Sequence, residues 1–147
     1  MALEGVYEPS PARWVRDQVE EYERSGGERA NTLRDTSLPV IIVTTRGNKS
    51  GKVRKWPLMR VEHDGEYALV ASKGGAPTNP DWYYNLLAHP DVSIELGNEQ
   101  LPVRARVASG EERNRIWNAQ KAAIPTFADY EQSAGGRVIP VVVLDPV

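Results

Sequence analysis

Six consecutive β-branched residues, Val40–Thr45, constrain the fold of this chain more than any other feature. Two heavy atoms on each Cβ are crowded in a helix but pack well on a pleated sheet. The run shows no polar alternation, so we expect a strand that is buried on both faces. The chain of 147 residues is long enough to form one domain with a continuous core around such a strand.

Two antiparallel hairpins are predicted in addition to this strand, because pairs of strand-like segments flank short turn dipeptides. The pairs are 53–62 with 66–72 around Asp64-Gly65, and 92–96 with 101–108 around Gly97-Asn98. Pro57 lacks the backbone N–H of a central strand, which indicates a sheet edge or a bulge. A last strand is expected at 138–144, interrupted by Pro140.

Three helices are predicted. The first spans 9–24, where Val15, Val19 and Tyr22 share one face. A short helix through Ala88 follows Asn79-Pro80-Asp81, which provides an N-cap, a proline at the first helical position and an acidic first turn.

The third helix is expected to run from a capping box at Ser109–Glu112 to about Ala123, followed by an irregular segment at 125–136. About six mainly antiparallel strands with three helices indicate an α+β barrel and not a series of βαβ units.

Composition excludes several classes of protein. Cysteine is absent, so disulfides and thiolate metal sites are impossible, and His63 and His89 have no ligand partner at helical spacing. No apolar run approaches the roughly 18–20 residues of a membrane span. The start of the chain lacks a secretory pattern, so we expect a cytoplasmic protein. A net charge of −2 without a basic face argues against nucleic acid as a partner.

Positive charge is concentrated in residues 38–73, which contain seven Lys/Arg against three Asp/Glu, although the whole chain has a net charge of −2. Such a block focuses the electrostatic potential on an anionic ligand. Within it, the turn 47–52 is not a P-loop, because its glycines are one residue too close and Val53 replaces the Ser or Thr that binds magnesium. Its backbone amides, with Lys49 and Ser50, suit a phosphate or carboxylates, while a solvated basic hairpin turn is the alternative.

Three further segments are candidates for binding a flat ligand. The glycines of 72–75 allow the backbone to approach a ligand closely, and Trp82 in a first helical turn can cover a planar ring. Ile124, Phe127 and Tyr130 recur every three residues, as in one wall of a lid. The alternatives are a plain loop, core packing of Trp82 and a packed connector.

Together these blocks resemble the deazaflavin-dependent nitroreductase family of actinobacteria, whose members use the deazaflavin coenzyme F420. The matching stretches are 38–58, 71–86, His89-Pro90 and 137–141, and the resemblance covers about residues 10–147. It implies a split β-barrel related to barrels that bind flavin mononucleotide (FMN). Residues 38–147 are then the coenzyme-binding domain, and residues 1–37 are an N-terminal helix and polar loop of the same domain.

The resemblance also implies a set of site residues. The phosphate and oligoglutamate tail of the coenzyme are expected at Asn48, Lys49, Ser50, Arg54 and Lys55. The ring and ribityl portion are expected at Trp56, Pro57, Leu58, Val70, Ala71, Ser72 and Lys73, with Asp81, Trp82, Tyr83, Tyr84, Asn85 and Phe127 completing the pocket.

The activity implied by the resemblance is hydride transfer from the reduced deazaflavin to a quinone, enone or nitro compound. The protein orients the ring and the acceptor. Nitroimidazole-reducing members of the family have three tyrosines in the lid, where this chain has Ile124, Phe127 and Tyr130 as its substrate-binding residues. We therefore expect a preference for quinone-like or other hydrophobic acceptors, with Ser72 and Tyr130 as candidate catalytic residues that donate a proton or orient the acceptor.

Two alternatives stay open at this point. An FMN-dependent oxidoreductase on the same barrel needs only the phosphate site, and a non-catalytic deazaflavin or lipid-binding module agrees with the apolar wall. A small-molecule acceptor is the expected partner. Peripheral membrane contact through Trp14, Val15 and Val19 is disfavoured, because the acidic segment 1–37 would be repelled by anionic lipids.

Overall fold

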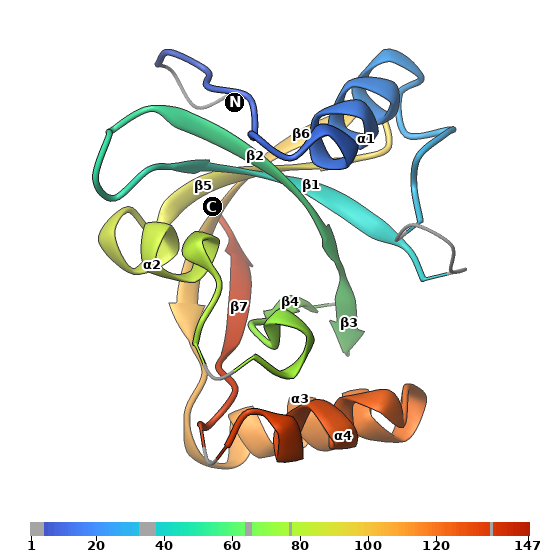
Figure 1. Cartoon of the computed structure of the whole chain (residues 1–147), viewed down its shortest axis with the longest axis vertical. Helices are drawn as coiled ribbons and strands as arrows, with labels where there is room; N and C mark the ends of the chain where they lie inside the picture. Colours follow the sequence, from blue (N-terminus) through green and yellow to red (C-terminus); the bar gives the residue numbers. More distant parts are fainter. Residues whose placement is uncertain (1–4, 33–37, 64–65, 77, 136) are drawn as a thin grey trace.

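The computed structural model describes residues 5–32, 38–63, 66–76, 78–135 and 137–147. Within these ranges the chain forms one curled antiparallel sheet with helices packed against it (Figure 1). The strands are β1 (Val40–Arg46), β2 (Val53–Met59), β3 (Val61–His63), β4 (Glu66–Val70), β5 (Asp91–Leu96), β6 (Glu99–Val107) and β7 (Val141–Pro146). The helices are α1 (Arg13–Arg24), the 3-10 helix η1 (Lys73–Gly75), α2 (Asp81–Ala88), α3 (Gly110–Ala123) and α4 (Thr126–Ser133).

The sheet confirms the predicted α+β split barrel. Its strand order is β2-β1-β5-β6-β7-β4-β3, and every neighbouring pair of strands is antiparallel. All of Val40–Thr45 is buried, as predicted for a strand covered on both faces. One face of β1 enters the barrel core through Ile41 and Val43, while Ile42 packs on α1.

The predicted strand 53–62 is divided into two, and this division explains why the sheet curls. β2 pairs with β1 at one edge of the sheet, whereas β3 pairs with β4 at the opposite edge. Only Arg60 separates the two strands, and its backbone N–H donates to the Pro39 carbonyl at 3.3 Å. The two sheet edges must therefore approach each other there. Pro57 lies in the edge strand β2, as its missing N–H predicted.

The helices largely follow the predictions. α1 buries Val15, Val19 and Tyr22 as expected, although it begins at Arg13 and not at residue 9. α2 is capped by Pro80, so the predicted cap at Asn79 is wrong by one residue. No helix among the described residues combines the length and apolar character needed to cross a membrane.

The capping box predicted for α3 is wrong in its side-chain contacts. Ser109 is the N-cap residue but forms no capping hydrogen bond through its side chain. Glu112 instead accepts two hydrogen bonds from the Arg106 guanidinium, at 2.6 and 3.0 Å. A bidentate pair with a guanidinium is stronger than a bond to one backbone amide, which explains why Glu112 pairs with Arg106 and not with the N-cap backbone.

The segment after α3 is helical, so the predicted irregular segment 125–136 is wrong. α4 begins directly after Pro125 and buries Phe127 against the indole of Trp117, with ring centroids 6.0 Å apart. The Trp117 Nε1–H donates to Glu131 of α4 at 2.6 Å. Tertiary contacts with α3 thus stabilise a short helix whose own sequence has only one buried residue. The last strand begins at Val141, later than predicted.

The turn after α1 lies directly on the β5–β6 turn, and glycine is required at the contact. A Cβ on Gly27 would lie 2.4 Å from the Gly97 Cα, and Gly27 has a φ of +82°. The Tyr22 hydroxyl strengthens the same contact, because it donates to the Glu95 carbonyl at 3.1 Å and accepts from the Gly97 N–H at 2.8 Å. This contact fixes α1 against the barrel.

We predict that Gly27→Ala lowers the free energy of unfolding by roughly 2–4 kcal/mol, because it combines backbone strain with a steric clash. Gly135→Ala is the matched control, since Gly135 also has a positive φ (+66°) but a Cβ there meets no atom within 4 Å. The control should cost only the conformational term, about 1–2 kcal/mol. Thermal unfolding of both variants measures the difference, and equal losses would contradict the proposed clash.

Candidate functional site

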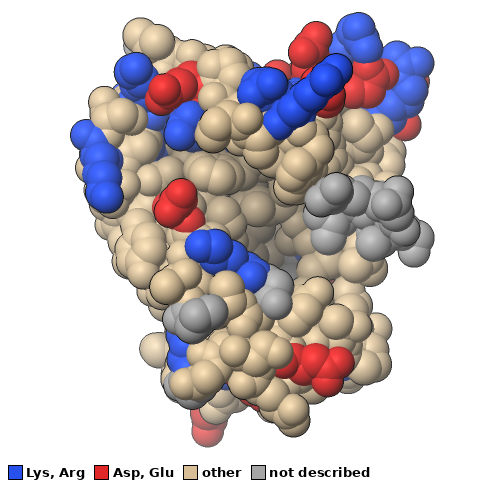
Figure 2. Space-filling view, in the orientation of Figure 1, with Lys and Arg blue, Asp and Glu red and all other residues tan. Residues whose placement is uncertain are grey.

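A cavity of about 620 Å³ opens between the curled sheet and α4. Mostly uncharged side chains surround the hollow near the centre of Figure 2, charged side chains of both signs lie at its left edge, and Lys and Arg together with Asp and Glu occupy the region above it. The lining residues come from six parts of the chain: Trp14, Val15, Leu38, Trp56, Pro57, Leu58, Met59, Leu69, Val70, Ser72, Lys73, Pro80, Trp82, Ile124, Thr126, Phe127 and Tyr130. The volume and the mainly apolar walls are typical of a site for a small organic ligand.

Most of the residues predicted to contact the ring and the substrate meet in this cavity. Trp56, Pro57 and Leu58 from β2 lie across from Val70 and Ser72, and Trp82 comes from α2. Ile124, Phe127 and Tyr130 form the wall on the side of α4, as their spacing predicted. Ala71 is fully buried in the barrel core and is not among the lining residues.

Arg137 holds the loop that follows β4. Its guanidinium donates to the Ala71, Ser72 and Ala76 carbonyls at 2.7–3.1 Å and to the Asn79 side-chain oxygen. A planar guanidinium has five N–H donors, which suits several carbonyls converging on one point. The loop is thereby fixed with Ser72 and Lys73 at the cavity. In the sequence, Arg137 stands out only as part of the stretch 137–141 that matches the family. Its hydrogen bonds to the loop become visible only in the folded structure.

Gly75 joins the same loop to α4. It has a φ of +83°, and a Cβ there would lie 2.9 Å from the Tyr130 Cα. Tyr130 in turn packs edge-to-face on Phe127, with ring centroids 5.2 Å apart. The position of the α4 wall therefore depends on the loop that Arg137 holds.

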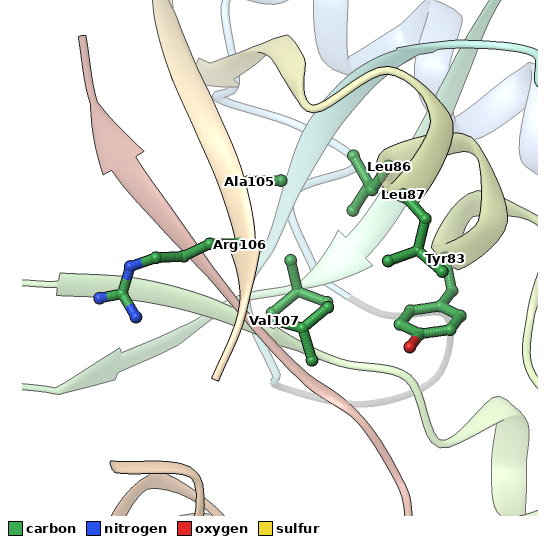
Figure 3. Close-up of a pocket in the computed structure, with 7 residues that line it drawn as sticks. Tyr83, Leu86, Leu87, Ala105, Arg106 and Val107 are labelled. Carbon is green, nitrogen blue, oxygen red and sulfur yellow. The ribbon is translucent and has the colours of Figure 1, made fainter. Parts of the chain in front are cut away.

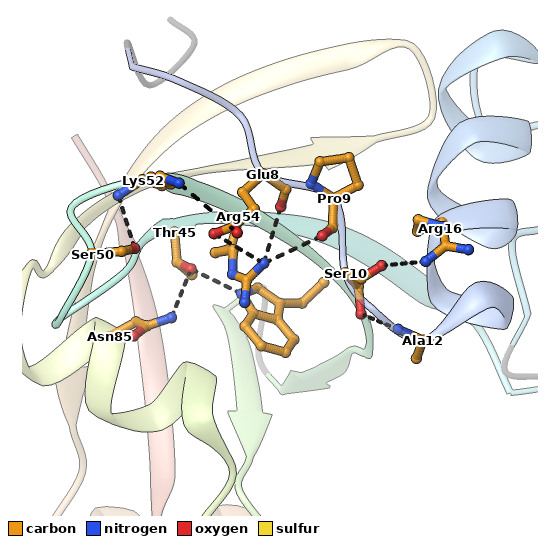
Figure 4. A network of polar contacts seen from close by, with 11 residues as sticks. Glu8, Pro9, Ser10, Ala12, Arg16, Thr45, Ser50, Lys52, Arg54 and Asn85 are labelled. Atoms are coloured by element: carbon orange, nitrogen blue, oxygen red, sulfur yellow. Dashed lines mark hydrogen bonds and ion pairs between the residues drawn. The ribbon is translucent and has the colours of Figure 1, made fainter.

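The turn between β1 and β2 is attached to the cavity wall through buried polar groups (Figure 4). The Asn48 backbone N–H donates to the Asn85 side-chain oxygen at 3.0 Å, and the Asn85 amide donates to the Thr45 hydroxyl at 3.3 Å. The same hydroxyl accepts from Trp56 Nε1–H at 2.9 Å. Asn85 of α2 is thus bonded directly to the turn and, through the Thr45 hydroxyl, to the Trp56 indole of the cavity wall. No sequence pattern indicated this role for Thr45.

The basic residues of this region have different surroundings. Lys49 and Ser50 are exposed at the tip of the turn, and no ion pair to Lys49 is found within the described residues. Arg54 interacts with the Glu8 carboxylate at 3.5 Å. Lys55 lies beside α1, where its ammonium is 2.5 Å from the Glu23 carboxylate. Of the five residues expected to bind the tail, Lys55 is therefore separated from the others.

Only part of the predicted segment 81–85 reaches the site. Tyr83 faces a separate hollow of about 40 Å³ with Leu86 and Leu87, against Val107 of β6 (Figure 3). That volume admits only a few water molecules, so the hollow is too small for a ring. Asp81 and Tyr84 are exposed, whereas Trp82 and Asn85 are buried at the site.

Glu95 of β5, which lies outside the cavity lining beside Glu23 and Lys55, carries a strong electrostatic perturbation. Burial raises the pKa of the Glu95 carboxyl to about 7, the nearby Glu23 carboxylate adds to this shift, and Lys55 opposes it. One oxygen of Glu95 has no hydrogen-bond partner among the described residues. The shift thus favours the neutral acid in the folded protein relative to the unfolded chain. Among the described residues no group of three His, Cys, Asp or Glu side chains is arranged to hold a metal ion.

The sequence of this chain is similar to those of known proteins. The sequence profile of the family described as F420H(2)-dependent quinone reductase matches residues 14–146. Rv3178 of Mycobacterium tuberculosis is 39% identical over 111 residues, which cover 74% of this chain and 91% of that protein. Rv1261c of the same species, described as an F420H(2)-dependent quinone reductase, is 36% identical over 109 residues, 72% of each chain.

A solved structure is also similar. The protein described as F420-H2 dependent reductase FDR-A is 47% identical, with a TM-score of 0.66. The match covers 73% of this chain and 94% of that chain.

The raised pKa of Glu95 predicts how stability depends on pH. The folded protein binds this proton more tightly than the unfolded chain does. The resulting contribution to the free energy of unfolding is complete below about pH 4.5 and is lost as the pH rises through about 7. Glu95→Gln should therefore be more stable than the parent above pH 7, by about 1–2 kcal/mol after allowance for partial solvent exposure. Denaturant unfolding at pH 5 and pH 8 measures this, with Glu99→Gln in the same hairpin as the control. Parallel pH curves for parent and Glu95→Gln would contradict the assignment.

Proposed function

Because the chain belongs to the F420H(2)-dependent quinone reductase family, we propose that it transfers a hydride from reduced coenzyme F420 to a quinone or a similar small acceptor. The most direct support is that the apolar cavity and the basic turn lie next to each other along one face of β2. An enzyme for a flat ring with an anionic tail needs both parts in one continuous site.

The spacing along β2 fits such a ligand. Side chains at every second position share a face, so Arg54, Trp56 and Leu58 form one row. At about 3.3 Å per residue the row is roughly 13 Å long. Trp56 and Leu58 line the cavity, while Arg54 lies next to the turn. We place the ring beside Trp56 and Trp82, and the phosphate and tail at Asn48, Lys49, Ser50 and Arg54.

When bound, the reduced deazaflavin supplies the hydride. The residues of this chain bind the ring, exclude water and orient the acceptor. Ser72 is nine-tenths buried, and Tyr130 lies on α4, which packs against the same loop, so their two hydroxyls are the groups that we assign to orienting the acceptor or holding a proton. Ile124 and Phe127 add apolar surface to the α4 wall, which supports a hydrophobic quinone as acceptor.

We also propose that residues 38–147 form the coenzyme-binding barrel and that the preceding helix belongs to the same domain. The packing of Val15, Val19 and Tyr22 on Ile42 supports this. The absence of cysteine is in keeping with a reducing compartment, and we propose the cytoplasm as the place of action.

The test is a titration of the protein with coenzyme F420 and with FMN, followed by intrinsic tryptophan fluorescence. Trp56 and Trp82 line the cavity, so ring binding should quench their emission. We expect F420 to bind and FMN to bind much more weakly. Lys49→Ala should weaken F420 binding about 2- to 5-fold at low salt, as for an exposed charge pair, and less at high salt. Arg115→Ala, an exposed cation on α3, is the control. Preferential FMN binding would contradict the proposed coenzyme.

Removal of the two hydroxyls should affect turnover more than coenzyme binding. We expect Ser72→Ala or Tyr130→Phe to lower kcat with a quinone by roughly 10- to 100-fold, at or below the lower end of what positioned proton donors contribute. The Kd for F420 should stay within about 2-fold of the parent value, because these hydroxyls act on the acceptor. Stopped-flow oxidation of the reduced coenzyme measures the first quantity and fluorescence titration the second. Unchanged kcat in both variants would remove these residues from the mechanism.

A further inference from the structure

We propose that Glu8 is an intramolecular competitor for the anionic tail of the coenzyme, and that it determines how strongly binding depends on that tail. This inference rests on the proposed function. It starts from the position of residues 5–10, which follow the outer edge of β2 next to the basic turn (Figure 4). We call this segment the N-terminal strap.

The strap is anchored to β2 through its backbone. The Val53 N–H donates to the Val6 carbonyl at 2.8 Å, and the Glu8 N–H donates to the Val53 carbonyl at 2.9 Å. Tyr7 thereby forms a parallel bridge with Val53. Since β2 is an edge strand, these bonds satisfy backbone groups that no other strand pairs. Such pairing depends on the backbone alone and would hold the strap in place whatever the side chain at position 8.

The side chain of Glu8 lies between Arg54 of the candidate tail site and the neighbouring Lys52. Its carboxylate is 3.5 Å from the Arg54 guanidinium and 4.0 Å from the Lys52 ammonium. Arg54 also donates to the Glu8 and Pro9 carbonyls, each at 3.3 Å. The carboxylate therefore occupies a position that a carboxylate of the oligoglutamate tail would also prefer.

The contacts of the Glu8 carboxylate are long and partly exposed, so they can be exchanged. The side chains of Glu8, Arg54 and Lys52 retain 43%, 28% and 50% of their exposure. Exposed ion pairs of this length are weak and are screened by salt. A tethered weak group still competes, because its local concentration is high. A tail with several carboxylates can displace it, whereas a ligand without a tail has no contact with it.

Glu8 lies outside the cavity. It is absent from the cavity lining, which holds Trp56 and Trp82 instead. Its effect should therefore be restricted to ligands that reach the basic turn. The competition then discriminates between deazaflavins by their tails, while the cavity recognises the ring.

The experiment compares the parent protein with Glu8→Gln, which removes the charge but keeps the size of the side chain. The control is Glu28→Gln, which removes an equal charge at an exposed position on the loop after α1. The probes are F420 with its oligoglutamate tail and the same deazaflavin lacking phosphate and tail. We expect Glu8→Gln to bind the tailed coenzyme about 2- to 5-fold more tightly at low salt, with a smaller gain at high salt. Binding of the tailless compound should not change, and Glu28→Gln should match the parent for both.

Hydrogen exchange at the Val53 amide controls for loss of the strap. This amide is bonded to the Val6 carbonyl and should remain protected in Glu8→Gln. Unchanged or weaker binding of the tailed coenzyme by Glu8→Gln overturns the inference, as does an equal gain for both probes or a loss of Val53 protection that accompanies the gain. If the parent and every variant fail to bind either deazaflavin, the proposed function is wrong, and the inference falls with it.

Discussion

The fixed arrangement of the candidate site depends on one side chain, the Arg137 guanidinium. A loop that runs through the interior must pair its backbone carbonyls, since buried unpaired groups are costly. Arg137 satisfies three such carbonyls and the Asn79 side chain from a position 58–66 residues away in the chain. The loop then places Ser72 at the cavity and brings Gly75 against Tyr130, so the α4 wall inherits its position from the same contacts.

The cavity itself follows from the way the sheet curls. Consecutive strands of one segment lie at opposite edges of the sheet, with the turn at Arg60 between them. Trp56 and Leu58 from one edge are thereby brought across from Leu69 and Val70 next to the other edge. The core side chains fill only part of the curl, and Thr126, Phe127 and Tyr130 of α4 cover the part that remains open. An apolar site for a flat ligand is thus a consequence of the barrel's closure and not of one particular motif.

Local patterns predicted those parts of the fold that local physics determines. The β-branched run of β1, the β5–β6 hairpin and the short β3–β4 part of the other predicted hairpin are examples, and most of the predicted cavity residues were found together because their segments border the barrel opening. α4 was missed because its stabilisation comes from Trp117 of another helix, and Phe127 is the one residue that the helix itself buries. The link through Thr45 and Asn85 could not be predicted either, since two buried polar residues 40 positions apart give no periodic signal.

The electrostatic effect of residues 38–73 is a further property that the sequence alone does not predict well. Their summed charge overstates the positive potential that a ligand would experience. Summed along the sequence, residues 38–73 are strongly positive, but the fold returns acidic residues of the N-terminal segment to them: Glu8 to Arg54 and Glu23 to Lys55. The field that reaches a ligand is therefore weaker and more local than the sum implies, and the turn that carries the exposed Lys49 contributes to it. A weak local field cannot bind a coenzyme alone. In the proposed function, the apolar cavity would supply most of the binding free energy, and the basic turn would discriminate between ligands by their tails.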